Sequence, residues 1–321
     1  MIGSVLALVL FAGFDSTPPR PLLDLLEDAE AAATFDYPSL GDAERLSELD
    51  AALQQEVDRR RAGSRCVTPA EQAVLTGLAT ASAAQSHEAW RADREAAEHH
   101  LERWRALIET VLAGEAAQAD DLANAQRWIE AARDAPTPRL AELFRRSAWD
   151  QAWRGGYLDG PDGWAGDVVP GVMQRINRTI AAEGCRQDME NAVWLKTELD
   201  AHGWFRISQH GEEADRAAWL IVQHADQDPQ FQTAVLAMLE PLVALGETRP
   251  SSYAYLHDRV AVNTGRPQRY GTQGRCTAPN VWTPRMIEDE ARVEALREQV
   301  DIGSLTEYRA HMSRFCAHYD G

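Results

Sequence analysis

The chain has 321 residues, a length that suits about two domains, and 45% of its residues are hydrophobic and 26% charged. These proportions are ordinary for a soluble globular protein, and they exclude a chain that is disordered throughout or crosses a membrane many times. The 50 acidic residues outnumber the 32 basic ones, which gives a formal net charge of -18. This excess opposes non-specific binding to nucleic acid, because that binding needs Lys and Arg to neutralise phosphates.

An apolar run occupies residues 2–14 at the N-terminus. It is shorter than the roughly 20 residues of a membrane-spanning helix and has the length of the apolar part of a signal peptide. No Lys or Arg precedes the run and no A-x-A cleavage site follows it, so an apolar helix packed on the core is the alternative. Residues 1–17 are predicted to be a signal peptide and the start of a linker. The protein would then be periplasmic or secreted, and cytoplasmic if the run is not a signal.

Four cysteines bear on the same question: Cys66, Cys185, Cys276 and Cys316. None of them lies in a CxxC pair, which argues against a zinc ribbon or a thioredoxin-like redox motif. In an exported protein they can pair as disulfides, with a connectivity that the sequence leaves open. Separate buried thiols are the alternative. We expect at least one disulfide.

Residues 18–135 have a helical pattern of apolar residues throughout. Helices are predicted from after Gly41 to Arg61, from Pro69 to Gly114 with a break near Ser82, and from Asp120 to 135. Short loops between them favour antiparallel packing, so this part is expected to be a helical N-terminal region. Three histidines of the second helix, His87, His99 and His100, are interpreted as solvated or capping residues.

Residues 136–321 remain helical, but turns, Gly and Trp become denser. Helices are predicted from Asp167 to Gly184, on to Gly203, at 212–224, at 229–245 with Asp228 as the N-cap, and from Ser251 to before Gly265. A short strand is predicted at 204–208 and a small irregular or β element at 265–287. The last helix begins with a capping box formed by Ser304 and Glu307. The fold class is therefore mainly α, with a helical N-terminal region and an α-rich second domain.

Polar clusters of the second domain fall where its helices should bury apolar residues. They are DQAWR (150–154), WLIVQHAD (219–226), YLHDR (255–259) and GRPQRYGTQ (265–273). In the first cluster, Asp150 and Arg154 have the i, i+4 spacing of an ion pair. In the second, His224 shares a helix face with apolar residues. Asp226 has no evident structural role, because Asp228 already caps the next helix.

The blocks DQAWR, NAVWLKTELDAHGW (191–204), GEEADRAAWLIVQHADQDPQFQ (211–232), AYLHDRVAV (254–262) and GRPQRYGTQ resemble, in order and spacing, a bacterial family of unknown function, DUF6624. The resemblance covers about residues 137–312. At 289–305 the chain departs from the family pattern, with VEALREQVDIGSL in place of VDxRR followed by GL, which puts a shared role for arginines at 292–297 in doubt. The resemblance implies no known activity, so the chemistry has to be inferred from the residues.

Buried polar side chains must be paired, so these blocks form either a structural network or a functional site. If they converge, the chemistry predicted is that of a hydrolase or another general acid–base enzyme. His224 would carry protons, because an imidazole titrates near neutral pH, and Asp226 or Asp258 would orient its ring. The candidate substrate-binding residues are Gln151, Arg154, Gln223, Arg259, Gln268, Tyr270 and Gln273.

Neither a metal nor a cofactor is predicted. His224, Asp226 and Asp258 could supply metal ligands, but no HExxH motif supports zinc. No GxSxG motif supplies a nucleophile, and Thr272 is only a weak candidate. The alternative function is a non-catalytic module that binds a small polar ligand, a peptide or a protein, with the polar blocks as a structural network. No nucleic-acid partner and no integral membrane domain are expected, and the oligomeric state is open.

Overall fold

The protein, in a computed structural model, is described over residues 20–61, 66–114, 122–154 and 168–317. It is mainly α, as predicted. The first part contains α1 (Arg20–Leu25), α2 (Ala29–Thr34), η1 (Tyr37–Leu40), α3 (Ala43–Arg61), α4 (Pro69–Ala83), α5 (His87–Leu112) and α6 (Ala123–Arg133). The second contains α7 (Pro138–Arg154), α8 (Pro170–His202), α9 (Ile207–His210), α10 (Glu212–His224), α11 (Pro229–Ala244), α12 (Pro250–Asn263), β1 (Gly274–Ala278), β2 (Val281–Pro284), α13 (Val293–Gln299), α14 (Leu305–Ser313) and η3 (Arg314–Cys316).

Side-chain caps fix several of the predicted helix ends. The Asp228 carboxylate accepts a hydrogen bond from the Phe231 backbone N–H at 2.9 Å. Ser304 and Glu307 form the predicted capping box at the start of α14. Ser86 caps α5, so the break expected near Ser82 separates α4 from α5. These caps satisfy backbone N–H groups that have no partner inside the helix. The caps predicted at Asp120 and Asp167 lie outside the described residues.

The prediction that a helix ends at Gly184 was wrong. Helix α8 continues through Gly184 to His202. Here the glycine allows a close contact, because a Cβ added at Gly184 would lie 3.1 Å from the Trp153 ring. The Trp153 indole N–H also donates to the Ile180 carbonyl at 2.8 Å. Tertiary packing between α7 and α8 therefore outweighs the low helix propensity of glycine.

The strand predicted at 204–208 was also wrong. Trp204 and Phe205 are buried in the short segment between α8 and α9. The apolar residues of this segment pack on helices and have no neighbouring strand there. By contrast, β1 and β2 pair as an antiparallel hairpin, which confirms the β element predicted near 265–287.

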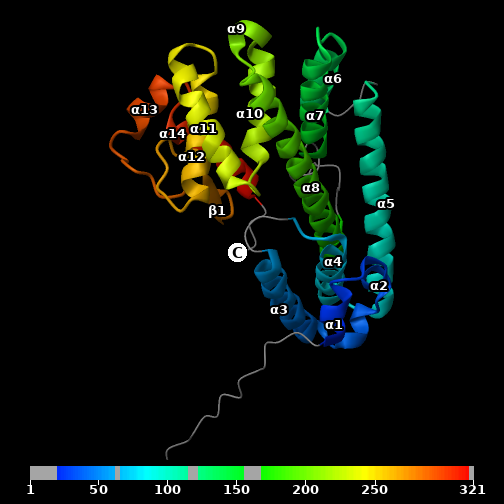
Figure 1. Cartoon of the computed structure of the whole chain (residues 1–321). Helices are drawn as coiled ribbons and strands as arrows, with labels where there is room; N and C mark the ends of the chain where they lie inside the picture. The colour runs from blue at the N-terminus through cyan, green and yellow to red at the C-terminus, as the bar shows by residue number, and fades with distance from the viewer. Residues whose placement is uncertain (1–19, 62–65, 115–121, 155–167, 318–321) are drawn as a thin grey trace, which may run out of the picture.

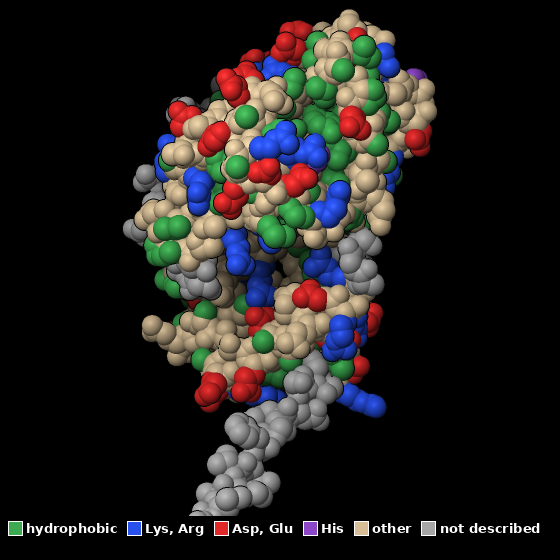
Figure 2. Space-filling view, turned by 90° about the vertical axis from the view of Figure 1, so that its left-hand side faces the viewer, with side chains coloured by type: hydrophobic (Ala, Val, Ile, Leu, Met, Phe, Trp, Pro, Cys, Tyr) green, Lys and Arg blue, Asp and Glu red, His purple; other side chains and the backbone are tan. Residues whose placement is uncertain are grey.

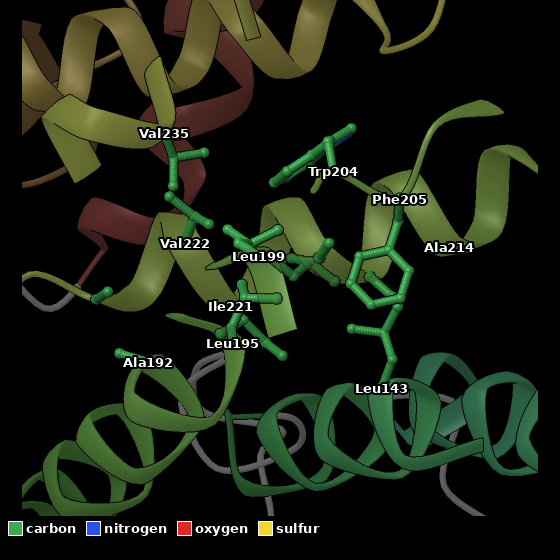
Figure 3. Close-up of a cluster of buried hydrophobic side chains, with 14 of the residues drawn as sticks. Leu143, Ala192, Leu195, Leu199, Trp204, Phe205, Ala214, Ile221, Val222 and Val235 are labelled. Carbon is green, nitrogen blue, oxygen red and sulfur yellow. The ribbon is translucent and has the colours of Figure 1, made fainter. Parts of the chain in front are cut away.

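Helix α8 organises the molecule. It contacts α4 and α5 of the first part and α7 and α10 of the second, and Figure 1 shows it running through the centre between them. Its upper half packs into the largest apolar cluster. Figure 3 shows Leu195 and Leu199 of α8 in this cluster with Leu143 of α7, Ile221 of α10 and Phe205. Because α8 bridges both parts, residues on its middle turns can meet side chains from either one.

Two disulfides confirm the expectation of at least one. Cys66, just before α4, pairs with Cys185 of α8, and Cys276 of β1 pairs with Cys316 of η3. Disulfides are typical of secreted and periplasmic proteins, so the pairs are consistent with either location. None of the described helices is long and apolar enough to cross a membrane. The predicted signal peptide, residues 1–17, lies outside the described residues.

Candidate active site

Asp150 is the centre of a charged cluster between α7, α8 and α10. Its carboxylate is almost fully buried and accepts hydrogen bonds from His224 Nδ1 at 2.8 Å and from Gln151 Nε2 at 2.8 Å. The Arg154 guanidinium, one turn later on α7, also binds it, which confirms the predicted ion pair. The helical pattern that should bury an apolar residue at position 150 therefore buries a carboxylate with partners on two helices.

Asp188 of α8 completes the cluster. Its Oδ2 lies 2.5 Å from Arg154 Nη2, so one guanidinium binds both carboxylates. One carboxylate oxygen of Asp150, one of Asp188 and one ring nitrogen of His224 all lie within 4.8 Å of one another, as the ligands of a metal ion would. Asp188 Oδ1 is buried and has no hydrogen-bond partner among the described residues. Asp188 therefore keeps one oxygen that the protein itself does not occupy.

The pKa values of the two carboxyl groups are shifted in opposite directions. Burial alone would raise the pKa of Asp150, but His224 and Arg154 more than offset it and hold this pKa below its ordinary value. Burial raises the pKa of Asp188 to about 6, with Arg154 opposing the rise and the charge on Asp150 adding to it. Neighbouring carboxyls with separated pKa values are the usual arrangement for one group that stays ionised and one that carries a proton.

A cavity of about 460 Å³ opens beside this cluster, and its lining includes Arg154, Asp188, His224, Asp226 and Arg259. Neighbouring cavities of about 300 and 190 Å³ share Gln227 with it, so the hollow continues along α8. Figure 2 shows a hollow between the lower part of the molecule and the body above it, with Lys and Arg side chains around it. The charged cluster therefore faces a solvent-filled space large enough for a small molecule.

Asp226 forms a second polar group at the edge of the cavity. Its carboxylate accepts from Arg259 Nη1 at 2.6 Å and from Asn263 Nδ2 at 3.0 Å. Gln232 Nε2 donates to the same carboxylate at 3.1 Å. These contacts join the turn after α10 to α11 and α12. Among the described contacts of His224, its ring is paired with Asp150 and not with Asp226.

Asp258 lies elsewhere, under the loop at 268–273. Its fully buried carboxylate accepts backbone hydrogen bonds from Arg269 at 2.8 Å, Tyr270 at 3.0 Å and Thr272 at 2.9 Å. The Thr272 hydroxyl donates to it as well, at 3.0 Å. All of these donors belong to the loop, so the carboxylate shapes the loop, and Asp258 is not among the described residues that line the cavity.

The opposite charge beneath this loop is Arg297 of α13, which is also fully buried. Its guanidinium donates to the carbonyls of Tyr270 at 2.6 Å, Ile302 at 2.9 Å and Gly303 at 2.8 Å. Asp258 thus accepts hydrogen bonds from backbone N–H groups, while Arg297 donates hydrogen bonds to backbone carbonyls. Among the arginines of the divergent stretch 292–297, Arg297 therefore has a clear structural role.

The remaining candidates divide between these two places. Gln268 is buried in the loop, where its side chain binds the backbone of Gln273 and Arg285. Tyr270 is buried there as well, and the Gln273 side chain donates to Thr272. Gln223 is buried on α10, with Oε1 unpaired among the described residues. The structure therefore brings His224, Asp226, Gln151, Arg154 and Arg259 together, and it places Asp258, Gln268, Tyr270 and Gln273 apart from them.

Sequence reasoning did not identify Asp188 and did not assign Asp150 to His224. Asp188 lies one turn after Gly184, where the helix was expected to end, so its face could not be read from the pattern. Asp150 comes from a helix 74 residues before His224 in the chain. Its signal was present as a charged residue on a stripe of apolar positions.

Comparison with known proteins finds a family model that matches part of the chain. Residues 176–315 match the model of DUF6624, a family of unknown function. The resemblance is confirmed, although the match starts within α8 rather than at residue 137. The DUF6624 segment carries Asp188, His224, Asp226 and Arg259, while Asp150 and Arg154 precede it. No curated protein and no solved structure matches the chain.

The raised pKa of Asp188 predicts how stability depends on pH. Because the folded state favours the protonated carboxyl, the contribution of Asp188 to stability is full below the unfolded pKa of 3.8 and is lost as pH rises through about 6. The neutral variant Asp188→Asn should therefore gain about 2–3 kcal/mol relative to wild type between pH 4 and pH 7. Urea unfolding across this range measures the change.

The control is Asp200→Asn, an exposed position on the same helix. Its difference from wild type should stay constant over the same pH range. A constant difference for Asp188→Asn as well would mean that the folded protein holds this carboxyl at an ordinary pKa.

Proposed function

We propose that the cavity beside His224 is the active site of a general acid–base enzyme, most simply a hydrolase. The observation that supports this is the pair of carboxyls, Asp150 and Asp188, bound to one guanidinium and shifted to opposite sides of their ordinary pKa. His224 stands beside both of them and lines the cavity. A purely structural ion pair has no need of a carboxyl that holds its proton near neutral pH.

His224 is the base in this proposal. An ionised Asp150 accepts the proton of Nδ1–H, so the neutral ring carries no proton on Nε2. That nitrogen can then take a proton from water or from a substrate hydroxyl. Asp150 also stabilises the imidazolium that forms, in the way a buried carboxylate supports histidine in other hydrolases.

Asp188 is the acid. With a pKa of about 6 it is partly protonated near neutral pH, and its unpaired Oδ1 can donate to a leaving group. Arg154 holds Asp188 and Asp150 in place through its two terminal nitrogens. The same guanidinium supplies positive charge beside both carboxylates.

The substrate in this proposal is a small polar molecule or the end of a peptide. The cavity of about 460 Å³ falls in the usual range for small-molecule sites, and Asn177, Gln227 and Arg259 add hydrogen-bonding groups to its lining. Trp153 offers an aromatic surface at the same cavity. The proposed location is outside the cytoplasm, supported by the two disulfides and by the apolar run at residues 2–14.

The test is hydrolysis of chromogenic esters, anilides and glycosides by the purified protein, with and without EDTA. We expect turnover of at least one class, and His224→Ala should lower kcat/KM about 100-fold or more, because general-base catalysis contributes that much. Free imidazole should restore part of the activity, since the variant opens space at the cavity. His99→Ala, on an exposed turn of α5, is the control and should retain full activity.

Other outcomes separate the alternatives. Loss of activity in EDTA that Zn²⁺ or Mn²⁺ restores would assign Asp150, Asp188 and His224 to a metal. No turnover by wild type in any class, or full activity in His224→Ala, would contradict the acid–base proposal. No turnover by wild type, combined with saturable binding of a peptide or polar ligand, would favour the non-catalytic binding module.

A further inference from the structure

A second polar cavity lies in the N-terminal part of the protein, and all of its lining residues precede the DUF6624 segment at 176–315. It has a volume of about 510 Å³ and is lined by Thr34, Asp36, Trp90, Arg91, Arg94, Glu95, Glu98 and Arg175. A deeper cavity of about 290 Å³ shares Trp90, Arg94, Glu98 and Arg175 with it and adds Tyr37 and Thr76. The two cavities therefore have Arg94 and Arg175 in common.

These two arginines have no carboxylate partner among the described residues. Arg94 donates to the Ala33 carbonyl at 2.8 Å, and its guanidinium lies 4.9 Å from the centre of the Trp90 ring. Arg175 Nε is buried without any hydrogen-bond partner in the described part of the chain. Burial and the charge on Arg94 lower the pKa of Arg175, while Glu98 and Tyr37 oppose this. Two guanidinium groups thus stand close enough to repel each other.

Two carboxylates that line these cavities, those of Glu98 and Asp36, already pair with other side chains. Arg105 binds both Glu98, at 3.3 Å, and Glu183, at 2.7 Å. At the outer rim, Asp36 lies 2.7 Å from His87. Glu95 is exposed. The inner cavity therefore retains the positive charges of Arg94 and Arg175 after its ion pairs have formed, although the chain as a whole has 50 acidic and 32 basic residues.

A buried hydroxyl faces the same space. Thr76 of α4 is 3% exposed, lines the inner cavity, and its Oγ1 has no hydrogen-bond partner among the described residues. A buried hydroxyl or guanidinium without a partner costs free energy, so a site that keeps several of them is explained most simply by a ligand that binds them. Guanidinium forks match the oxygens of carboxylates and phosphates, often through paired hydrogen bonds.

We propose that this cavity binds the oxyanion group, a carboxylate or a phosphate, of a small ligand between Arg94 and Arg175. The Thr76 hydroxyl donates a further hydrogen bond to it. The two cavities of this site share no lining residue with the cavity beside His224, so this proposal does not depend on the acid–base function. The net charge of -18 repels anions in general, so an anion that binds this chain must do so at a local positive site.

The test is calorimetric titration of the full chain with inorganic phosphate and with succinate at constant ionic strength. We expect at least one of the two to bind at one site, and the stronger binder identifies the oxyanion. Arg94→Gln and Arg175→Gln should each weaken that binding about tenfold or more, because each removes charge-assisted hydrogen bonds. Arg59→Gln, an exposed position on α3, is the control and should leave the binding unchanged.

Stability without ligand supplies a second readout. Arg175→Gln should unfold at a temperature no lower than wild type, because it removes a half-buried charge that has no carboxylate partner among the described residues and is repelled by Arg94. A clear fall in its unfolding temperature, with binding unchanged, would make Arg175 a structural residue and overturn the proposal. Absence of binding by both anions up to about 10 mM would overturn it as well, since that is weaker than ordinary recognition of a small ligand.

Discussion

Replacement of Asp258 by Ala is expected to lower the free energy of unfolding by about 3–5 kcal/mol. The carboxylate is fully buried and accepts hydrogen bonds from the backbone N–H groups of Arg269, Tyr270 and Thr272 and from the Thr272 hydroxyl. Alanine would leave these buried donors without an acceptor. It would also remove one of the negative charges that favour the buried Arg297 guanidinium, the other carboxylate being that of Glu294. Chemical denaturation at pH 7 measures the loss.

A matched control for this variant is Asp200→Ala, an exposed position that should change stability by less than about 0.5 kcal/mol. Thr272→Val tests the same network more gently, since it removes only the hydroxyl donor and keeps the backbone one. A loss below about 1 kcal/mol for Asp258→Ala would show that the loop does not depend on this carboxylate. Asp258 would then again be a candidate for chemistry.

The second large loss is expected for Arg154→Met, at about 3–5 kcal/mol at pH 7.5. Its guanidinium is the shared partner of Asp150 and Asp188, and the variant would leave two neighbouring carboxylates buried without a cation. The loss should be smaller at pH 5, because the Asp188 carboxyl, whose pKa is about 6 beside Arg154 and higher without it, is then mostly protonated and uncharged. Unfolding measured at the two pH values tests both statements.

The double variant Arg154→Met with Asp188→Asn should recover part of this loss, because one of the two charges is then gone. Arg145→Met is the control: Arg145 lies on the same helix but is exposed, and among the described residues its ion pair is with Glu142. Equal losses for Arg154→Met and Arg145→Met would mean that the buried carboxylates do not depend on Arg154. That result would also weaken the proposed active site, which relies on this guanidinium to hold Asp188.

Sequence reasoning succeeded where the signal is local. The Asp228 cap, the box of Ser304 and Glu307, and the pair of Asp150 with Arg154 each lie within one or two turns, and the structure contains all three. The placement of His224 on an inward face follows from the period of α10. In each case the deciding contact lies within a few residues, where chain geometry leaves little freedom.

Other features depend on tertiary packing and could not be predicted. The partner of His224 comes from α7, and Asp188 reaches the cluster only because α8 continues past Gly184 against Trp153. The pairing of Cys66 with Cys185 joins residues 119 positions apart. Asp258 seemed a candidate for chemistry because its donors are backbone groups, which a sequence pattern does not display. The division into regions at 135 and 136 stays a prediction.

The buried charges of Asp258 and Arg297 affect which substitutions the loop at 268–273 can tolerate. Asp258 and Arg297 hold the loop mostly through its backbone N–H and carbonyl groups, which every sequence provides. Outward-facing side chains of the loop can therefore be replaced without dismantling its path. Grafted or randomised residues at a position such as Arg269, whose side chain is partly exposed and takes no part in these hydrogen bonds, should be displayed on a fixed frame. This makes the loop a promising place to engineer new recognition onto the protein.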